Sequence, residues 1–246
     1  MKLLFLSPSV QEFNLYVGEG NEEYYMNLIA DAMEPYLYAS GISFSRNNPE
    51  ESLGAAIAAS NAGNYQLHLA IHSNAAPESL SGQLQGADVY YYPSSTPSLA
   101  AAEIIARNYR AIYPDPEQVN VLPGPTLREL RRTIAPAVLL ETAYHDNPID
   151  AQWIRDNIGV IARNLVLSLS QIFNVPFNEP SEPKSAVVIT KMTSLNLRLK
   201  PTVMSPIIGK LPKGAYVTVY GGGENWTVVG YGGLLGFAQS QYLAIM

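Results

Sequence analysis

The chain has 246 residues, of which 47% are hydrophobic and 15% are charged, and it contains no cysteine. This composition belongs to a globular protein rather than a disordered one, and the length allows a domain with a sizeable core and a second, smaller one. A formal net charge of −6 argues against nucleic acid or an anionic membrane as a partner held by bulk charge. Without cysteine there is no disulfide and no thiolate metal site, which suits a protein that works outside the cell.

The first apolar run lies at residues 3–6, directly after a lysine. A signal peptide also begins with a positive residue, but its apolar core has about 7–15 residues and a small-residue cleavage site follows it. We therefore predict a buried strand over residues 2–7. No stretch approaches the ~20 apolar residues of a membrane span, so none is expected.

Helix-like and strand-like segments alternate up to residue 173. The spacing of Met26, Ile29, Met33 and Leu37 predicts a helix that starts at residue 22 and stops at Gly41. The same reasoning predicts strands at 42–47, 65–73, 86–93 and 135–144, and helices at 52–63, 98–113 and 150–173. This alternation favours an α/β fold with a mostly parallel sheet and helices on both faces.

The composition changes after residue 173. Residues 174–184 carry three prolines, two Asn and two Glu, which indicates a semi-rigid linker. From residue 185 onward, short β-rich runs are separated by Gly and Pro, and this pattern predicts a small β-barrel. We therefore divide the chain into a domain at 1–173, a linker at 174–184 and a second domain at 185–246.

Two of the three histidines lie in one predicted strand, at positions 68 and 72. Four residues of strand separate two side chains on the same face by about 13 Å, so His68 and His72 cannot bind one metal ion together. His72 lies at the C-terminal end of the strand, and ligands of open α/β sheets bind at that edge. We therefore predict that His72 is functional and that His68 is a hydrogen-bonded core residue.

Two glutamates are candidates for the same edge. Glu141 follows an apolar run in a predicted strand, where an unpaired carboxylate is costly to bury. It is either a general base tuned by half-dry surroundings or a buried partner of Arg131 or Arg132. At the start of the first predicted helix, Glu22 is explained by the helix dipole, whereas Glu23 faces the strand edge if the apolar stripe faces the core.

A histidine, a glutamate ligand and a free glutamate are the parts of a zinc hydrolase. The motifs "HSNA" with His72, "PAVLLETAYHDN" with Glu141 and "EEYYMNLIADAM" with Glu23 resemble the zinc-dependent N-acetylmuramoyl-L-alanine amidases. The stretches "SPSVQ" and "RNNP" are similar to a Firmicute branch of that family, and the resemblance covers about residues 1–175. It implies one Zn²⁺ held by His, Glu and His, with Glu23 and His72 as ligands and Glu141 as the catalytic base.

The sequence departs from this resemblance at one ligand. Relatives of the branch carry a histidine in "QEHN", where this chain reads "QEFN" with Phe13. Phenylalanine cannot bind zinc, which leaves His145 and Glu12 as possible substitute ligands. Two matched ligands predict weak zinc retention. They also leave open an alternative function, that of a cell-wall-binding protein with an amidase fold and an impaired or lost zinc site.

The tail, from Leu195 through Trp226 to Tyr242, resembles a bacterial SH3-type module. The resemblance implies binding of peptidoglycan stem peptides or bridges by Trp226 and Tyr242, unless the barrel only packs against its neighbour. Together the two resemblances imply a peptidoglycan hydrolase that cleaves the amide between N-acetylmuramic acid and L-alanine. We expect a monomer that acts outside the cell or in the cell wall. A peptidase of similar metal chemistry is a weaker alternative, because the tail would then serve no purpose.

Overall fold

A six-stranded sheet forms the centre of the first unit, and the computed structural model describes residues 2–246. Its strand order is β2-β1-β3-β6-β4-β5, and every neighbouring pair is parallel except β4 and β6. This confirms the predicted mostly parallel α/β sheet, to which the structure adds β5. The strands are β1 (Lys2–Pro8), β2 (Phe44–Arg46), β3 (Tyr65–Asn74), β4 (Ala87–Tyr91), β5 (Val119–Pro123) and β6 (Ala137–Tyr144).

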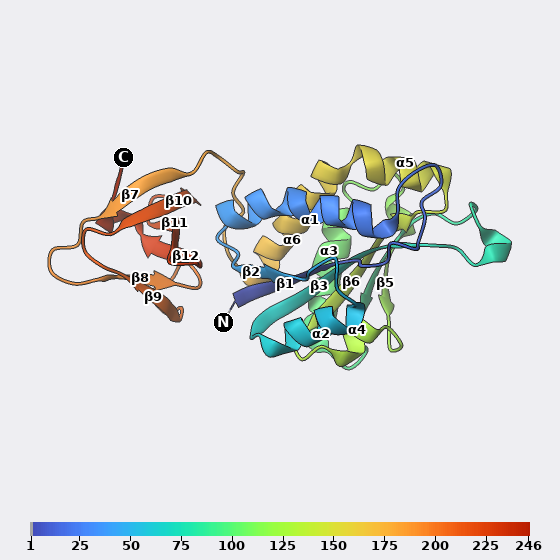
Figure 1. Cartoon of the computed structure of the whole chain (residues 1–246), viewed down its shortest axis with the longest axis horizontal. Coiled ribbons are helices and arrows are strands. Elements are labelled where there is room, and N and C mark those ends of the chain that lie inside the picture. Colours follow the sequence, from blue (N-terminus) through green and yellow to red (C-terminus); the bar gives the residue numbers. More distant parts are fainter. Residues whose placement is uncertain (1) are drawn as a thin grey trace.

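Helices cover both faces of this sheet (Figure 1). One face carries α1 (Glu22–Ala39), α3 (Thr96–Tyr109), α5 (Pro148–Asp156) and α6 (Ile158–Phe173), and the other carries α2 (Leu53–Ala62) and α4 (Arg128–Arg132). The closing helix predicted over 150–173 is divided at Asn157, whose side-chain amide donates to the carbonyl of Trp153 at 2.8 Å. No helix within residues 2–246 combines the length and the apolar character needed to cross a membrane.

The tail forms a second sheet in which all pairings are antiparallel, with the order β13-β7-β10-β11-β12-β8-β9. Its apolar side chains point into a small core of their own, which confirms the predicted β-rich domain. The strands are β7 (Lys184–Val188), β8 (Leu195–Arg198), β9 (Ile207–Leu211), β10 (Tyr216–Gly222), β11 (Trp226–Tyr231), β12 (Leu234–Gln239) and β13 (Leu243–Ile245).

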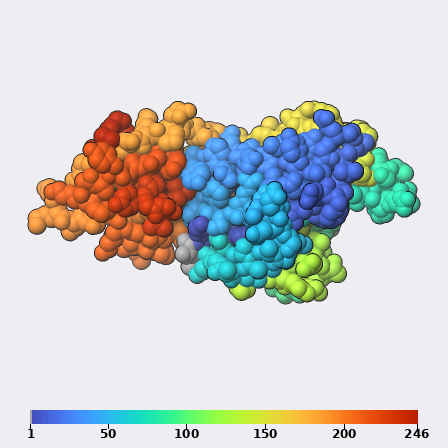
Figure 2. Space-filling view, viewed as in Figure 1, coloured from blue at the N-terminus to red at the C-terminus, as the bar shows by residue number. Residues whose placement is uncertain are grey.

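The two units share an apolar contact, and Figure 2 shows the tail in orange directly against the blue first unit. Phe237 of β12 is 1% exposed and belongs to the same buried cluster as Ile42. Tyr220 of β10 stacks on Tyr38 of α1, with ring centroids 5.1 Å apart. Glycine is required at Gly41, because a Cβ there would lie 2.5 Å from Phe237 Cζ and the backbone has a φ of +66°.

The segment between the units is also attached to the first one. The side-chain amide of Asn178 donates to the carbonyl of Ala39 at 2.9 Å, and its backbone N–H donates to Ser40 Oγ at 3.0 Å. Phe177 of this segment stacks on Tyr36 of α1. Both the segment and the tail therefore pack against α1. The domain limits at 173 and 185 stay predictions.

Candidate active site

The C-terminal ends of β3 and β6 bring two predicted residues together. His72 and Glu141 are register partners on these neighbouring parallel strands. Residues in register on adjacent strands project from the same face of the sheet, so the two side chains lie beside each other. Thr142 Oγ1 donates to the carbonyl of His72 at 3.0 Å and fixes one strand end to the other.

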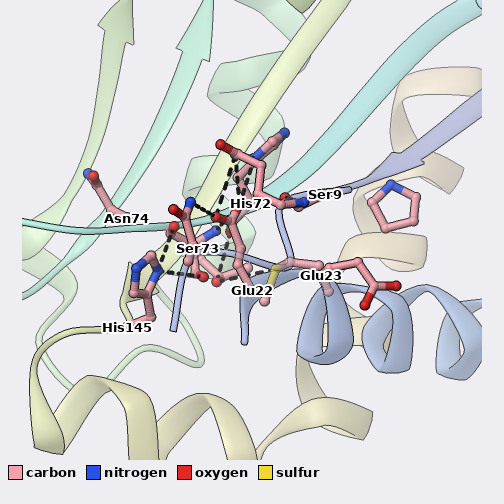
Figure 3. Close-up of polar contacts among 12 residues, drawn as sticks. Ser9, Glu22, Glu23, His72, Ser73, Asn74 and His145 are labelled. Atoms are coloured by element: carbon pink, nitrogen blue, oxygen red, sulfur yellow. Dashed lines mark hydrogen bonds and ion pairs between the residues drawn. The ribbon is translucent and has the colours of Figure 1, made fainter. Parts of the chain in front are cut away.

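The imidazole of His72 lies between two buried carboxylates. Its Nδ1 is 2.7 Å from Glu22 Oε1 (Figure 3), and its Nε2 is 3.0 Å from Glu129 Oε2. Burial disfavours the charged imidazole, but the hydrogen bonds to Glu129 and Glu22 outweigh burial and raise the pKa of His72 well above its usual value. At neutral pH, His72 is therefore an imidazolium that donates to both carboxylates.

Glu22, and not Glu23, is the residue of α1 that reaches His72. The second oxygen of Glu22 accepts a hydrogen bond from Asn14 Nδ2 at 2.5 Å. Burial raises the pKa of Glu22, but the hydrogen bonds from His72 and Asn14 bring this pKa below its usual value. The Glu23 carboxylate points away from His72 (Figure 3) and accepts a bond from Asn27 of its own helix at 3.1 Å.

The helical phase explains this correction. Glu22 precedes Met26 by four residues, and side chains four apart lie on the same face of a helix. Because Met26 is fully buried, Glu22 is carried into the buried face with it, whereas Glu23 is turned toward the solvent side. The prediction that Glu23 faces the strand edge is therefore wrong.

Glu129 on α4 is a site residue that the sequence analysis did not identify. Its Oε1 accepts a bond from Ser7 Oγ at 2.6 Å and lies 3.1 Å from His68 Nε2, while its Oε2 contacts His72. Burial opposes ionisation, but the hydrogen bonds from His68 and His72 lower the pKa of Glu129 far below its usual range. One carboxylate thus joins two histidines that the strand spacing keeps apart.

His68 lies deeper in the same network. It is 0% exposed, its Nδ1 is 3.0 Å from Ser60 Oγ of α2, and its ring stacks on Phe5. Both of its ring nitrogens have polar partners inside the protein, which is the arrangement expected of a hydrogen-bonded core histidine.

Glu141 has a different environment from the other two carboxylates. Its Oε2 is buried and finds no hydrogen-bond partner within residues 2–246. Among these residues, neither Arg131 nor Arg132 pairs with it, and both arginines are exposed. Burial raises the pKa of Glu141 to about 7, since the lowering effect of His72 is opposed by nearby carboxylates such as Asp88. Glu141 is therefore half-protonated near neutral pH.

Asp88 on β4 is a second residue that the sequence analysis missed. It is the antiparallel register partner of Glu141. Its Oδ1 accepts a bond from Asn120 Nδ2 at 3.0 Å, and its Oδ2 accepts one from the Tyr90 hydroxyl at 3.3 Å. The carboxylate of Asp88 thus lies beside that of Glu141, and both of its oxygens accept hydrogen bonds.

Neither possible substitute ligand, His145 nor Glu12, makes a hydrogen bond or ion pair with the ring of His72. His145 Nδ1 is 2.9 Å from the carbonyl of Ser73, and burial lowers the pKa of His145 below its usual value. Glu12 is exposed, and Phe13 is 75% exposed. The nearest side chain from this loop is Gln11, whose Nε2 lies 3.3 Å from His72 Nδ1.

Comparison with known proteins identifies the family of the first unit. A family model described as N-acetylmuramoyl-L-alanine amidase matches residues 15–171. The chain belongs to this amidase family. Its members are hydrolases, and a model of the bacterial SH3 domain matches residues 193–244. The predicted amidase family and the predicted bacterial SH3 module are thereby confirmed. No curated protein matches this amidase.

Solved amidase structures share the fold of this amidase. AmiC2 of Nostoc punctiforme has a TM-score of 0.63 and 17% identity, over 70% of this chain and 97% of that one. The catalytic domain of CwlV from Bacillus (Paenibacillus) polymyxa var. colistinus has a TM-score of 0.62 and 18% identity, over 72% and 100%. The catalytic domain of the CD27L endolysin, which targets Clostridia difficile, has a TM-score of 0.55 and 20% identity, over 72% and 100%. At these identities the likeness shows the fold alone.

The donor set of this amidase does not match the zinc site that the resemblance implies. A catalytic zinc ion takes three protein ligands, and a histidine ligand offers it the lone pair of a neutral ring. No group of three His, Cys, Asp or Glu side chains within residues 2–246 is arranged to hold a metal ion. Both nitrogens of His72 face carboxylates, and the further neighbour is the neutral amide of Gln11. We therefore derive the chemistry from the acid and base groups of the chain.

The SH3 part of the amidase carries a groove of about 600 Å³. Trp226 and Tyr242, the two residues predicted to bind the wall, both line it. Trp226 is half-buried and Tyr242 is 37% exposed, so each ring presents part of its surface to the groove.

Proposed function

We propose that this amidase hydrolyses peptidoglycan at the amide between N-acetylmuramic acid and L-alanine. The observation that carries the proposal is Glu141, a half-buried carboxyl group at the C-terminal end of β6 with one unpartnered oxygen and a pKa of about 7. A general acid–base catalyst works best when its pKa lies near the working pH. Membership of the amidase family supports the choice of substrate.

Glu141 moves one proton through the reaction. As a carboxylate it accepts a proton from a water molecule, whose oxygen attacks the lactyl carbonyl carbon of N-acetylmuramic acid. The same proton then passes from Glu141 to the nitrogen of L-alanine as the C–N bond breaks. The second water proton stays on the lactyl carboxyl group, which ionises at neutral pH and protonates the released amine. The products are therefore a lactyl carboxylate and a peptide with a free, protonated amino terminus, and Glu141 is regenerated as a carboxylate.

His72 holds the buried acids of this edge in place. It is the register partner of Glu141, and its two ring nitrogens are held by Glu22 and Glu129. Its role is positioning rather than proton donation, because both N–H groups already serve these carboxylates. Its charge also opposes the further rise of the Glu141 pKa. We assign this role to His72 in place of zinc ligation, and no catalytic role to Glu23.

We also propose that the tail places the enzyme on its substrate at the cell wall. The supporting observation is the groove lined by Trp226 and Tyr242. A second binding site on the same chain raises the local concentration of substrate at the active site without changing the active site itself.

The proposal is tested with the full chain and a soluble muramyl dipeptide, N-acetylmuramoyl-L-alanyl-D-isoglutamine. Mass spectrometry should detect free N-acetylmuramic acid and a dipeptide with a new amino terminus. Glu141→Gln should lower turnover by roughly 10²–10⁴-fold, since it removes the general base. Glu23→Gln is the matched control and should keep wild-type turnover.

Three outcomes would contradict the proposal. Cleavage at another bond of the muramyl dipeptide would contradict the proposed cleavage site. Near wild-type turnover of Glu141→Gln would show that this residue is not the general base. A wild-type chain that sediments with purified peptidoglycan but cleaves nothing would instead be a cell-wall-binding protein with an amidase fold.

A further inference from the structure

The groove of the tail is lined by residues 190–196, which run from the loop after β7 into β8, and by Arg198, Val203, Trp226, Gln239 and Tyr242. The two aromatic rings offer flat apolar surfaces, while the loop contributes hydroxyl groups. Such a mixture suits a peptide, whose backbone packs on aromatic rings and whose polar groups need hydrogen-bond partners.

The charge of the groove is opposite to that of the rest of the chain. Lys191 and Arg198 line it, and none of the described lining residues is an Asp or a Glu. Residues 185–246 contain five Lys or Arg and one Glu, whereas residues 1–184 contain ten Lys or Arg and twenty Asp or Glu. The tail is therefore positive and the catalytic part is negative. This difference makes the groove the favourable place on the chain for an anionic ligand.

Arg198 is positioned to bind such a ligand. Its Nη1 donates to the carbonyl of Ser205 at 2.7 Å, which holds the guanidinium in place. A guanidinium has five N–H donors, and within residues 2–246 Arg198 has no carboxylate partner. A held guanidinium with unused donors matches the two oxygens of a carboxylate, because both groups are planar.

We propose that the groove binds a free carboxylate of the peptidoglycan stem peptide. Arg198 and Lys191 contact the carboxylate, and Trp226 and Tyr242 pack against the peptide. This inference rests on the proposed function for the nature of the substrate and adds the chemical feature that the tail recognises. A peptide carboxylate is favoured over an anionic wall polymer, because a polyphosphate chain would need a row of cations rather than two beside aromatic rings.

The test uses the full chain carrying Glu141→Gln and isothermal titration with two peptides. One is the stem tetrapeptide with free carboxylates, and the other is the same peptide with each carboxyl group converted to a carboxamide. Amidation should weaken binding by about tenfold, the effect of losing a charge-assisted hydrogen bond. Arg198→Gln should weaken binding of the free acid by about the same factor and leave the carboxamide unchanged.

Matched variants separate recognition from folding. Lys191→Gln changes an exposed side chain and should cause a smaller loss, whereas Arg163→Gln, which breaks an ion pair with Glu179 outside the groove, should cause none. Arg198→Lys keeps the charge but loses the planar fork, so its affinity should lie between wild type and Arg198→Gln. Thermal unfolding of each variant checks that the tail is folded.

The proposal is overturned if acid and carboxamide bind equally, if neither binds, or if Arg198→Gln weakens both by the same factor. It is also overturned if poly(glycerol phosphate) displaces the peptide and binds more tightly through Arg198. The proposed function fails separately. If the wild type cleaves the muramyl dipeptide but acid and carboxamide bind equally, the inference fails while the proposed function stands. If the wild type cleaves nothing but binds the free acid as described, the inference stands for a wall-binding protein.

Discussion

Glu129 and Glu141 are two carboxyl groups beside one histidine, and their surroundings differ in nearly every respect. Glu129 accepts bonds from Ser7, His68 and His72, and its pKa is held far below the usual range. Glu141 has a buried oxygen without a partner, and its pKa is raised to about 7. Where environments drive the pKa values of neighbouring acids apart, the acids take different roles. Glu129 is suited to hold His72, and Glu141 is suited to exchange protons.

The comparison also indicates where the site is stable and where it is strained. A buried charge is tolerated when it is paired and fully hydrogen-bonded, and it is costly when it is not. The Glu22–His72–Glu129 group satisfies this condition, so removal of one member should lower the free energy of unfolding strongly. Glu141 does not satisfy it, so its removal should relieve a cost that the protein accepts for function.

The largest expected effect on stability is that of Glu129→Gln. This change leaves an amide N–H₂ facing a ring N–H, takes the charge partner from His72 and removes a carboxylate oxygen beside His68. Breaking a buried charge pair costs about 3–5 kcal/mol, so the free energy of unfolding should fall by that amount at pH 7. Urea denaturation measures it, with Glu103→Gln on the exposed side of α3 as the control. A loss below about 1 kcal/mol would show that Glu129 is not a structural partner of the histidines.

The second largest effect on stability is expected for Glu141→Gln, which should raise the free energy of unfolding rather than lower it. The pKa of Glu141 is about 7 in the folded protein against 4.5 when it is unperturbed, so the folded state binds the proton more tightly. The wild type therefore loses stability as the pH rises from about 4.5 to about 7, and Glu141→Gln does not. At pH 8 the variant should be more stable by about 3 kcal/mol, and the gain should vanish near pH 4.5.

Denaturation of both proteins between pH 4.5 and pH 8 tests this prediction. A variant that is less stable than wild type at pH 8 would mean that the Glu141 carboxylate is well solvated or paired.

The sequence was sufficient to predict one half of this site. Most residues that precede His72 in β3 and Glu141 in β6 are apolar, so the arrival of both residues at one sheet edge follows from strand length and direction. The other half depends on details that a pattern does not contain. Glu22 and Glu23 are adjacent acids at a helix start, and a rotation of one residue decides which of them is buried.

Glu129 could not be predicted for a different reason. It lies in "LRELRR", a short and highly charged stretch that is typical of a solvent-exposed turn. Its burial results from α4 packing over the end of β3, where two histidines offer partners for the carboxylate. The local sequence predicts that Glu129 is exposed, because burying a carboxylate is unfavourable. It does not reveal the tertiary hydrogen bonds that compensate for this burial.

The metal affinity of the site depends on which side chains surround the ring of His72. Because Phe13 points into solvent, Phe13→His should not complete a zinc site, whereas Gln11→His places an imidazole beside His72 and Glu22. Elemental analysis after dialysis should find zinc well below one ion per chain in wild type and Phe13→His. Gln11→His should retain more, since it supplies a third ligand. Stoichiometric zinc in the wild type would show that His72 exchanges a carboxylate partner for the metal.

The smallest effect concerns Asp88, whose negative charge helps to raise the pKa of Glu141. Asp88→Asn removes this charge and keeps an oxygen that can accept the bond from Asn120. The pKa of Glu141 should then fall. In the proposed mechanism the carboxylate form is the base, so kcat/KM should rise with pH through this pKa, and the rise should move to lower pH by a fraction of a unit. Asp115→Asn, on an exposed turn, should leave the profile in place. Carbon NMR of the Glu141 carboxyl gives the same pKa without turnover, and an unchanged or higher value in Asp88→Asn would contradict the prediction.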